Sequence, residues 1–93
     1  MDPMVTTPSR QQVVASVIEI VVRLAHERGI EIDPDALDEH TNVRDYDLDS
    51  MDQVLILNEV EDRWQVSVDD DAARSGESIG ALVNAVEAAL ATR

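Results

Sequence analysis

The sequence predicts an all-α fold, a small antiparallel bundle of three main helices plus one or two short helices. Apolar residues recur at spacings of three and four in three separate stretches, which is the period of an amphipathic helix. No pair of segments alternates apolar and polar residues as the strands of a hairpin do. A chain of 93 residues makes one small domain, and a bundle is the economical way to bury three apolar stripes.

The first helix is expected to begin after Ser9, because Ser9 and Gln12 fit a capping box and Pro8 suits the start of a helix. It is expected to end at Gly29, since glycine adopts the left-handed conformation that closes many helices. From where the first helix begins and the last helix ends, we expect residues 1–8 to be a flexible leader, residues 9–91 the folded domain and residues 92–93 its C-terminal end. The apolar face predicted to be buried consists of Val14, Val17, Ile18, Val21, Leu24 and Ala25.

A long loop is expected over residues 30–49. A short helical turn can start at Asp33-Pro34, and Leu37 and Val43 are the expected anchors into the core. A loop of this length inside a small domain is usually functional or disordered. It leads directly into the second helix.

The second helix is expected over residues 50–64. Its apolar residues include four in succession, which cannot all point inward, so some must face solvent or a partner. The residues assigned to the core are Ile56, Leu57, Val60 and Trp64. Those assigned to the solvent side are Met51, Leu55 and Asn58, beside Glu59, Glu61 and Asp62.

Two further helical segments complete the chain. Residues 69–74 predict a short turn of helix capped by acids, and Ser78 is expected to cap the last helix. Residues on one face of that helix repeat at the helical period and should be buried. They are Ile79, Leu82, Val83, Val86, Ala89 and Leu90.

Composition restricts the class of partner. The stretch from Glu31 to Asp71 holds 15 acidic residues against Arg44 and Arg63, so it carries the whole net charge of −13. Such a charge disfavours nucleic acid and anionic membranes and favours proteins with basic patches. The chain has no Cys, no long apolar run and no signal peptide, so we expect a cytoplasmic monomer that binds neither nucleic acid nor membrane. An acidic surface that only keeps the protein soluble is the alternative.

No metal site is expected, although the acids before the second helix resemble one. Asp45, Asp47 and Asp49 have the first spacings of an EF-hand calcium loop. That loop needs a glycine where Ser50 stands and a bidentate acid where Ile56 stands. Specific calcium binding is therefore not predicted.

No catalytic residue is expected either. A hydrolase with Ser50 as nucleophile would need a histidine base, and neither His26 nor His40 lies in a catalytic context. Ser50 follows turn-forming acids and opens a helical pattern, so its hydroxyl should be exposed at or beside a helix N-cap. A phosphate on it would be favoured by the helix N-terminus and opposed by the acids. A presented hydroxyl on an acidic domain suits a group carrier.

The chain resembles the acyl carrier proteins over most of its length. The tetrad Leu48-Asp49-Ser50-Met51 resembles their phosphopantetheine attachment site, and the order of the helices, the long first loop and the acidic second helix agree with it. The resemblance implies 4'-phosphopantetheine on Ser50, transferred from coenzyme A, with Asp49 and Met51 recognised by the transferase. It implies that partner enzymes dock on the second helix, at Leu55, Asn58, Glu59, Glu61 and Asp62.

The partners implied by the resemblance are a phosphopantetheinyl transferase, an acyl-loading ligase or acyltransferase, and downstream synthases or condensing enzymes. Several positions depart from the fatty-acid carriers. Met51 replaces the usual Leu, Tyr46-Asp47-Leu48 stands in place of Leu-Gly-Ala, Leu55 occupies a position that is often acidic, and Asn58 one that is often Met. These changes favour a specialised type II carrier for a fatty-acid, polyketide or lipopeptide pathway.

Two other interpretations remain open at the level of the sequence. A peptidyl carrier, which loads amino acids, usually has Gly-Gly before its Asp-Ser or His-Ser pair and is less acidic. An acidic helical adaptor would bind a basic protein without any cofactor. Modification of Ser50 would separate the adaptor from both carriers.

Overall fold

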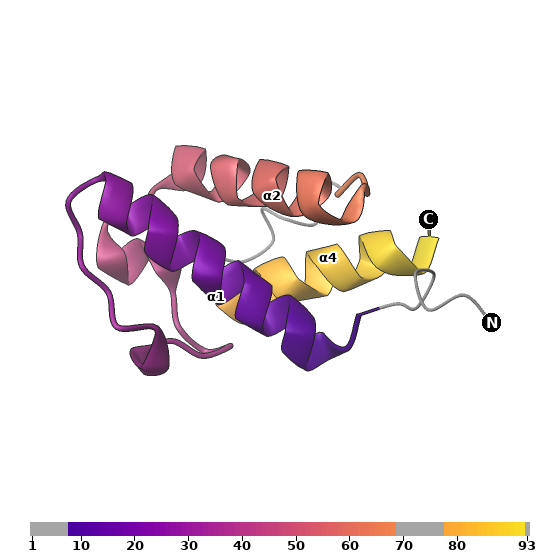
Figure 1. Cartoon of the computed structure of the whole chain (residues 1–93), viewed down its shortest axis with the longest axis horizontal. Helices are drawn as coiled ribbons and strands as arrows, with labels where there is room; N and C mark the ends of the chain where they lie inside the picture. The colour runs from indigo at the N-terminus through magenta and orange to yellow at the C-terminus, as the bar shows by residue number, and fades with distance from the viewer. Residues whose placement is uncertain (1–7, 69–77, 93) are drawn as a thin grey trace.

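The computed structural model describes residues 8–68 and 78–92. In these residues three α-helices pack together: α1 (Arg10–Glu27), α2 (Ser50–Trp64) and α4 (Ile79–Thr92). In Figure 1, α2 and α4 run in roughly the opposite direction to α1 and both lie against it. The one extended pairing among the described residues is an isolated bridge between Asn42 and Ser78. The predicted all-α bundle is therefore confirmed, while the short helix expected at 69–74 lies outside the described residues.

Both ends of α1 form as the sequence predicts. The Ser9 hydroxyl accepts the Gln12 N–H at 3.2 Å, and the Gln12 side chain accepts the Ser9 N–H at 2.8 Å, which completes the capping box. At the other end Gly29 has a φ of 81°, so its N–H reaches the His26 carbonyl while the Ile30 N–H reaches that of Ala25. This pair of bonds is the Schellman closure that glycine permits.

The buried face of α1 differs from the prediction. Val17, Val21 and Ala25 are buried as expected, but Val14, Ile18 and Leu24 are only partly buried. Val14 and Ile18 belong to a second apolar stripe, part of which lines a groove between α1 and the loop that follows it. Leu24 lies in line with the packed stripe, close to the end of the helix. The spacing of the apolar residues alone does not separate these cases. The fully packed stripe consists of Val13, Val17, Ile20, Val21 and Ala25.

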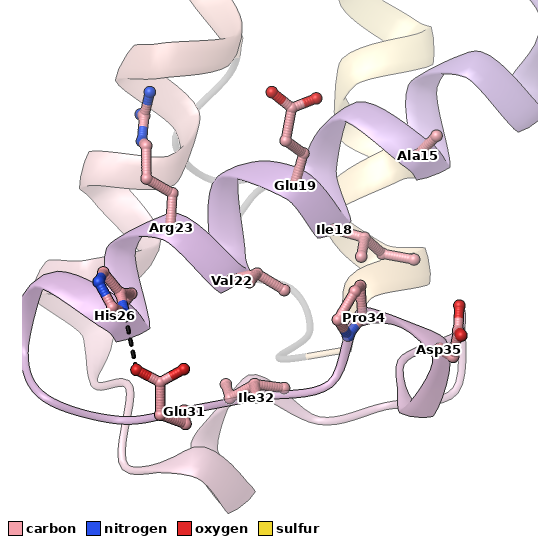
Figure 2. A pocket seen from close by; sticks show the side chains of 10 residues that line it. All are labelled: Ala15, Ile18, Glu19, Val22, Arg23, His26, Glu31, Ile32, Pro34 and Asp35. Atoms are coloured by element: carbon pink, nitrogen blue, oxygen red, sulfur yellow. Dashed lines mark hydrogen bonds and ion pairs between the residues drawn. The ribbon is translucent and has the colours of Figure 1, made fainter.

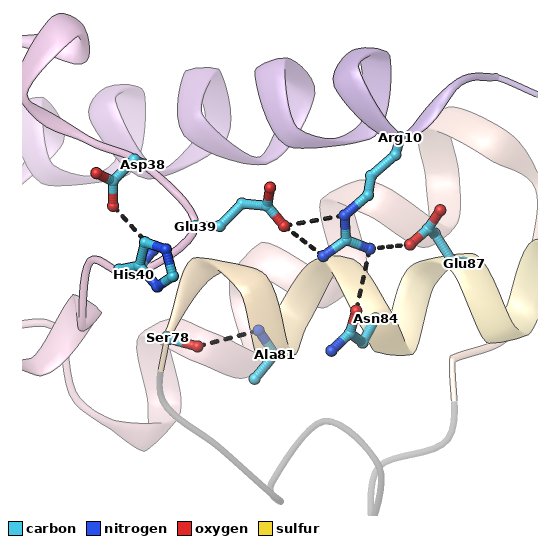
Figure 3. Close-up of polar contacts among 8 residues, drawn as sticks. All are labelled: Arg10, Asp38, Glu39, His40, Ser78, Ala81, Asn84 and Glu87. Atoms are coloured by element: carbon cyan, nitrogen blue, oxygen red, sulfur yellow. Dashed lines mark hydrogen bonds and ion pairs between the residues drawn. The ribbon is translucent and has the colours of Figure 1, made fainter.

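The predicted faces of α2 and α4 are confirmed. Ile56, Leu57 and Val60 are buried, and Trp64 is half-buried against the core. On the other side of α2, Met51 is 70% exposed. All six residues assigned to the buried face of α4 are buried, and the Ser78 hydroxyl accepts the Ala81 N–H at 3.1 Å, so it caps that helix (Figure 3).

The long loop is an ordered part of the bundle. It contains two short 3₁₀ turns, η2 (Pro34–Ala36), which starts after Asp33 as predicted, and η3 (Val43–Tyr46), which the sequence analysis missed. Leu37 and Val43 are buried, which confirms them as anchors. Ile32 and Leu48 are buried as well.

Backbone bonds and one arginine fix this loop against α4 and α1. The Ile79 and Gly80 N–H groups, at the start of α4, each donate at 2.9 Å to the carbonyls of Thr41 and Glu39. From the first turn of α1, the Arg10 guanidinium contacts the carboxylates of Glu39 and Glu87 and the side chain of Asn84 (Figure 3). The hydrogen bonds to both acids raise the pKa of Arg10. The loop is thus held at the end that leads toward η3 and α2.

Replacing Gly80 with alanine is expected to destabilise the fold by about 1–2 kcal/mol, because the new Cβ would lie 2.8 Å from the carbonyl oxygen of Glu39 and must push the loop away. Helix propensity alone predicts the opposite sign, a gain of up to about 1 kcal/mol. Urea unfolding followed by the fluorescence of Trp64 measures the difference. A higher unfolding midpoint in the variant would show that the loop does not pack tightly against α4.

Candidate functional site

Ser50 is the first residue of α2, and the residue that caps the helix is Asp49. The Asp49 carboxylate accepts the Asp52 N–H at 3.1 Å, and the Asp52 carboxylate accepts the Asp49 N–H at 2.9 Å. This reciprocal pair satisfies two of the N–H groups at the helix start without the Ser50 side chain. The hydroxyl of Ser50 is therefore exposed beside the cap and is not used to form it.

Asp52 has a structural role that the sequence analysis missed. Its side chain is fully buried, and its second carboxylate oxygen lies 2.6 Å from a guanidinium nitrogen of Arg28, the residue that ends α1. A buried carboxylate is stable when it is paired and hydrogen-bonded, and Asp52 is both. The spacing Asp49-x-x-Asp52 was the local sign of the cap, whereas the pair with Arg28 ties the end of α1 to the start of α2.

The cap also sets the charge next to Ser50. The pKa of Asp49 lies below its usual value, chiefly because its carboxylate accepts the backbone N–H of Asp52, with smaller contributions from the Asp52 side chain and the positive charge of Arg28. Asp49 therefore stays ionised at neutral pH. Ser50 has a fixed negative charge on its N-terminal side.

Arg44 brings a positive charge to the Ser50 hydroxyl. It belongs to η3, and its guanidinium donates a hydrogen bond of 2.8 Å to the Ser50 oxygen. Asn42 caps η3 by accepting the Arg44 N–H, and Asp47 closes it in the left-handed conformation with a φ of 63°. Glycine favours that conformation most, and Asp is among the few other residues that tolerate it. The arrangement explains how Asp47 can stand where the resembled fatty-acid carriers have Gly.

The residues predicted to dock partners lie in different environments. Leu55 is 43% exposed and Asn58 and Asp62 are exposed, as expected for a contact surface. Glu59 pairs with Arg23 of α1 at 2.6 Å, and the Glu61 carboxylate accepts the Val68 N–H at 2.8 Å. The structure thus gives Glu59 and Glu61 contacts within the protein.

An apolar patch lies beside Ser50 on the solvent side of α2. Met51, Val54 and Leu55 are the large apolar side chains that the described part of the chain leaves exposed. Val54 was not singled out by the sequence analysis, although it belongs to the run of four apolar residues that signalled an exposed surface. An apolar patch on a small protein often marks a contact with a partner.

A separate groove of about 680 Å³ lies between α1 and the loop that contains η2 (Figure 2). Ile18, Val22 and Ile32 contribute apolar side chains to it, and the His26 ring forms a 2.7 Å hydrogen bond with the Glu31 carboxylate at one end. The groove contains none of the residues predicted for the site. The α1 residues that line the groove lie on the other side of the helix from its packed stripe.

The described residues offer neither a metal-binding cluster nor a membrane-spanning helix. Across 8–68 and 78–92, no three His, Asp or Glu side chains gather so that they could hold a metal ion. In the same part of the chain, no helix combines the length and the apolar character needed to cross a membrane. The two histidines weighed as possible bases for Ser50 have other partners: the His26 ring bonds to Glu31 at the groove, and the backbone N–H of His40 donates to Asp38 in the loop.

Ser50 thus presents its hydroxyl at the start of an acid-capped helix, beside exposed apolar side chains. The family profile described as the phosphopantetheine attachment site matches residues 32–86, from the loop after α1 into α4. The chain belongs to this family, whose members carry covalently attached 4'-phosphopantetheine. The resemblance to acyl carrier proteins is consistent with it. No curated protein and no solved structure gives a significant match.

Proposed function

We propose that the chain is an acyl carrier in which Ser50 bears the 4'-phosphopantetheine. The observation that carries the proposal is the exposed Ser50 hydroxyl at the start of α2, inside the segment that the family profile matches. Two other hydroxyls in that segment have structural roles: Thr41 bonds to Asp38, and Ser78 caps α4. When attached, the cofactor supplies a terminal thiol that carries an acyl group as a thioester.

The exposed side chain of Ser50 fits such a group. The hydroxyl is not needed for the helix cap, so its modification would leave the bonds between Asp49 and Asp52 in place. Arg44 already donates a hydrogen bond to the oxygen that would become the ester oxygen. Asp49 and Met51, the neighbours on either side, are exposed and accessible to a transferase.

The proposal is tested by the intact mass of the protein before and after incubation with coenzyme A, Mg²⁺ and a broad-specificity phosphopantetheinyl transferase. We expect a gain of one phosphopantetheine on protein that starts unmodified. No gain with several transferases would contradict the carrier function and would favour the cofactor-free acidic adaptor.

We further propose that the carrier acts in a specialised type II pathway, for a fatty acid, a polyketide or a lipopeptide, as a cytoplasmic monomer. Its solvent side of α2 presents Met51, Val54 and Leu55 together with the charge of Asp62. A partner that fits this surface has an apolar contact flanked by basic residues. The transferase, the acyl-loading ligase or acyltransferase and the condensing enzymes would share it.

Reversing the charge of Asp62 to Arg is expected to slow phosphopantetheine transfer by roughly threefold to tenfold at low salt, because oppositely charged surfaces speed encounter. The effect should shrink at physiological salt. Asp62 is chosen for this test because Glu59 and Glu61 contact other parts of the protein, so changing them could also alter the fold. Asp35→Arg, in η2 against α1, is the control with the same change of charge. Equal rates for the two variants would remove Asp62 from the docking surface.

A peptidyl carrier is the second candidate, because the family profile does not distinguish the group that the thiol carries. The strong acidity and the absence of Gly-Gly before Asp49 favour the acyl carrier. The two kinds of carrier are distinguished by incubating the phosphopantetheine-bearing protein with ATP and either a fatty-acyl ligase or an amino-acid-activating enzyme. Aminoacylation without acylation would favour the peptidyl carrier.

A further inference from the structure

We propose that Arg44 is the binding residue for the phosphoryl group carried on Ser50, and that its guanidinium holds the root of the prosthetic arm against the start of α2. The inference rests on the proposed modification of Ser50. It assigns a role to a side chain outside the attachment tetrad, in the loop before α2. The contact that carries it is the 2.8 Å hydrogen bond from the Arg44 guanidinium to the Ser50 oxygen.

The geometry already brings the cation to the atom that would be esterified. A phosphoryl group on the Ser50 oxygen places its non-bridging oxygens one bond further out, within reach of a small rotation of the Arg44 side chain. A guanidinium has five N–H donors in a planar fork and can bind two phosphoryl oxygens at once. The present bond joins the Arg44 cation to a neutral hydroxyl. A phosphoryl group would give the cation an anionic partner, so the attraction between opposite charges should strengthen the contact.

The charges around Ser50 oppose a phosphoryl group there. Asp45, Asp47 and Asp49 are exposed within five residues of Ser50, and Asp49 is held ionised by its cap. A phosphoryl group added there meets repulsion from these acids. Arg44, whose guanidinium donates to the Ser50 oxygen, lies where it can offset part of the added negative charge.

The backbone around Arg44 is fixed before any modification. The Asn42 side chain accepts the Arg44 N–H at 2.8 Å, and the Asp47 N–H returns to the Arg44 carbonyl at 3.1 Å. Val43 and Leu48, on either side of this turn, are completely buried. A cation on a fixed turn loses less conformational freedom on binding than one on a mobile loop.

The test uses the whole chain phosphorylated at Ser50, which places a titrating phosphoryl group at the site without a transferase. The pKa of its second ionisation, ordinarily about 6, is measured by ³¹P NMR. Arg44→Gln is expected to raise this pKa by about 0.5, because a nearby positive charge favours the dianion. Arg44→Lys, which keeps the charge but not the fork, should raise it by less.

The matched control is Arg63→Gln, which removes one positive charge from the other end of α2, about 20 Å away along the helix. At physiological salt this distance exceeds the screening length, so the pKa should change by less than about 0.1. Circular dichroism verifies that each variant is folded. If Arg44→Gln and Arg63→Gln give the same pKa, the proposal is overturned.

The pKa measurement and the loading assay together distinguish a failure of the Arg44 contact from a failure of the carrier function. A raised pKa in Arg44→Gln combined with no transferase loading of the wild type would support the phosphoryl contact and reject the carrier. Loading of the wild type without a raised pKa would support the carrier and reject the role of Arg44.

Discussion

Ser50→Ala is expected to abolish phosphopantetheine loading completely while leaving the fold intact. The variant lacks the one oxygen on which the phosphoryl group would be placed. The cap of α2 is made by Asp49 and Asp52, and alanine is a good helix former at an exposed position, so the free energy of unfolding should change by no more than about 0.5 kcal/mol.

Intact mass after incubation with the transferase and urea unfolding followed by circular dichroism measure these two expectations on the same protein. Ser67→Ala is the matched control, because Ser67 is also exposed and lies within the segment that the family profile matches. It should load as the wild type does. Residual loading of Ser50→Ala would place the attachment elsewhere, and a large loss of stability would contradict an exposed hydroxyl outside the cap.

Asp52→Ala is expected to destabilise the protein by about 2–3 kcal/mol. The substitution removes the acceptor for the Asp49 N–H and the carboxylate that pairs with Arg28 at 2.6 Å, in a side chain that is 0% exposed. Breaking a fully buried ion pair costs more, but the Arg28 side chain is 44% exposed and can be solvated again. The first turn of α2 should fray, so loading of Ser50 should slow as well.

Two other substitutions separate the causes of this loss. Asp52→Asn keeps an oxygen that can accept the Asp49 N–H but loses the charge, so it should cost less than Asp52→Ala. Asp62→Ala removes an exposed acid from the same helix and should cost no more than about 0.5 kcal/mol. Equal unfolding midpoints for Asp52→Ala and Asp62→Ala would show that the buried pair does not stabilise the start of α2.

Sequence patterns located the helices well because their ends are determined by neighbouring residues. The cap at Ser9, the glycine closure at Gly29 and the span of α2 depend on contacts a few residues apart. The solvent side of α2 followed from a simple count, since four apolar residues in a row cannot all be buried on one helix. These features were readable without a structure.

Contacts between segments far apart in the chain could not be predicted from such local patterns. Asp52 is buried because Arg28 of another helix reaches it, and the buried stripe of α1 is chosen by the positions of α2 and α4. Arg44 lies near Ser50 because η3 folds the chain back through a left-handed residue, Asp47. Asn42 and Asp47 are residues that favour such turns, so the sequence gives a weak indication of η3. It gives no indication that Arg44 in this turn contacts Ser50.

The most direct test of the account is to locate the added mass on the loaded wild-type protein after digestion with trypsin. Cleavage after Arg44 and Arg63 releases residues 45–63, which contain Ser50 as their one serine and no threonine. We expect one phosphopantetheine on this peptide, and fragmentation should place it on Ser50. Added mass on any other peptide, or none on this one, would contradict the assignment of Ser50 as the carrier residue.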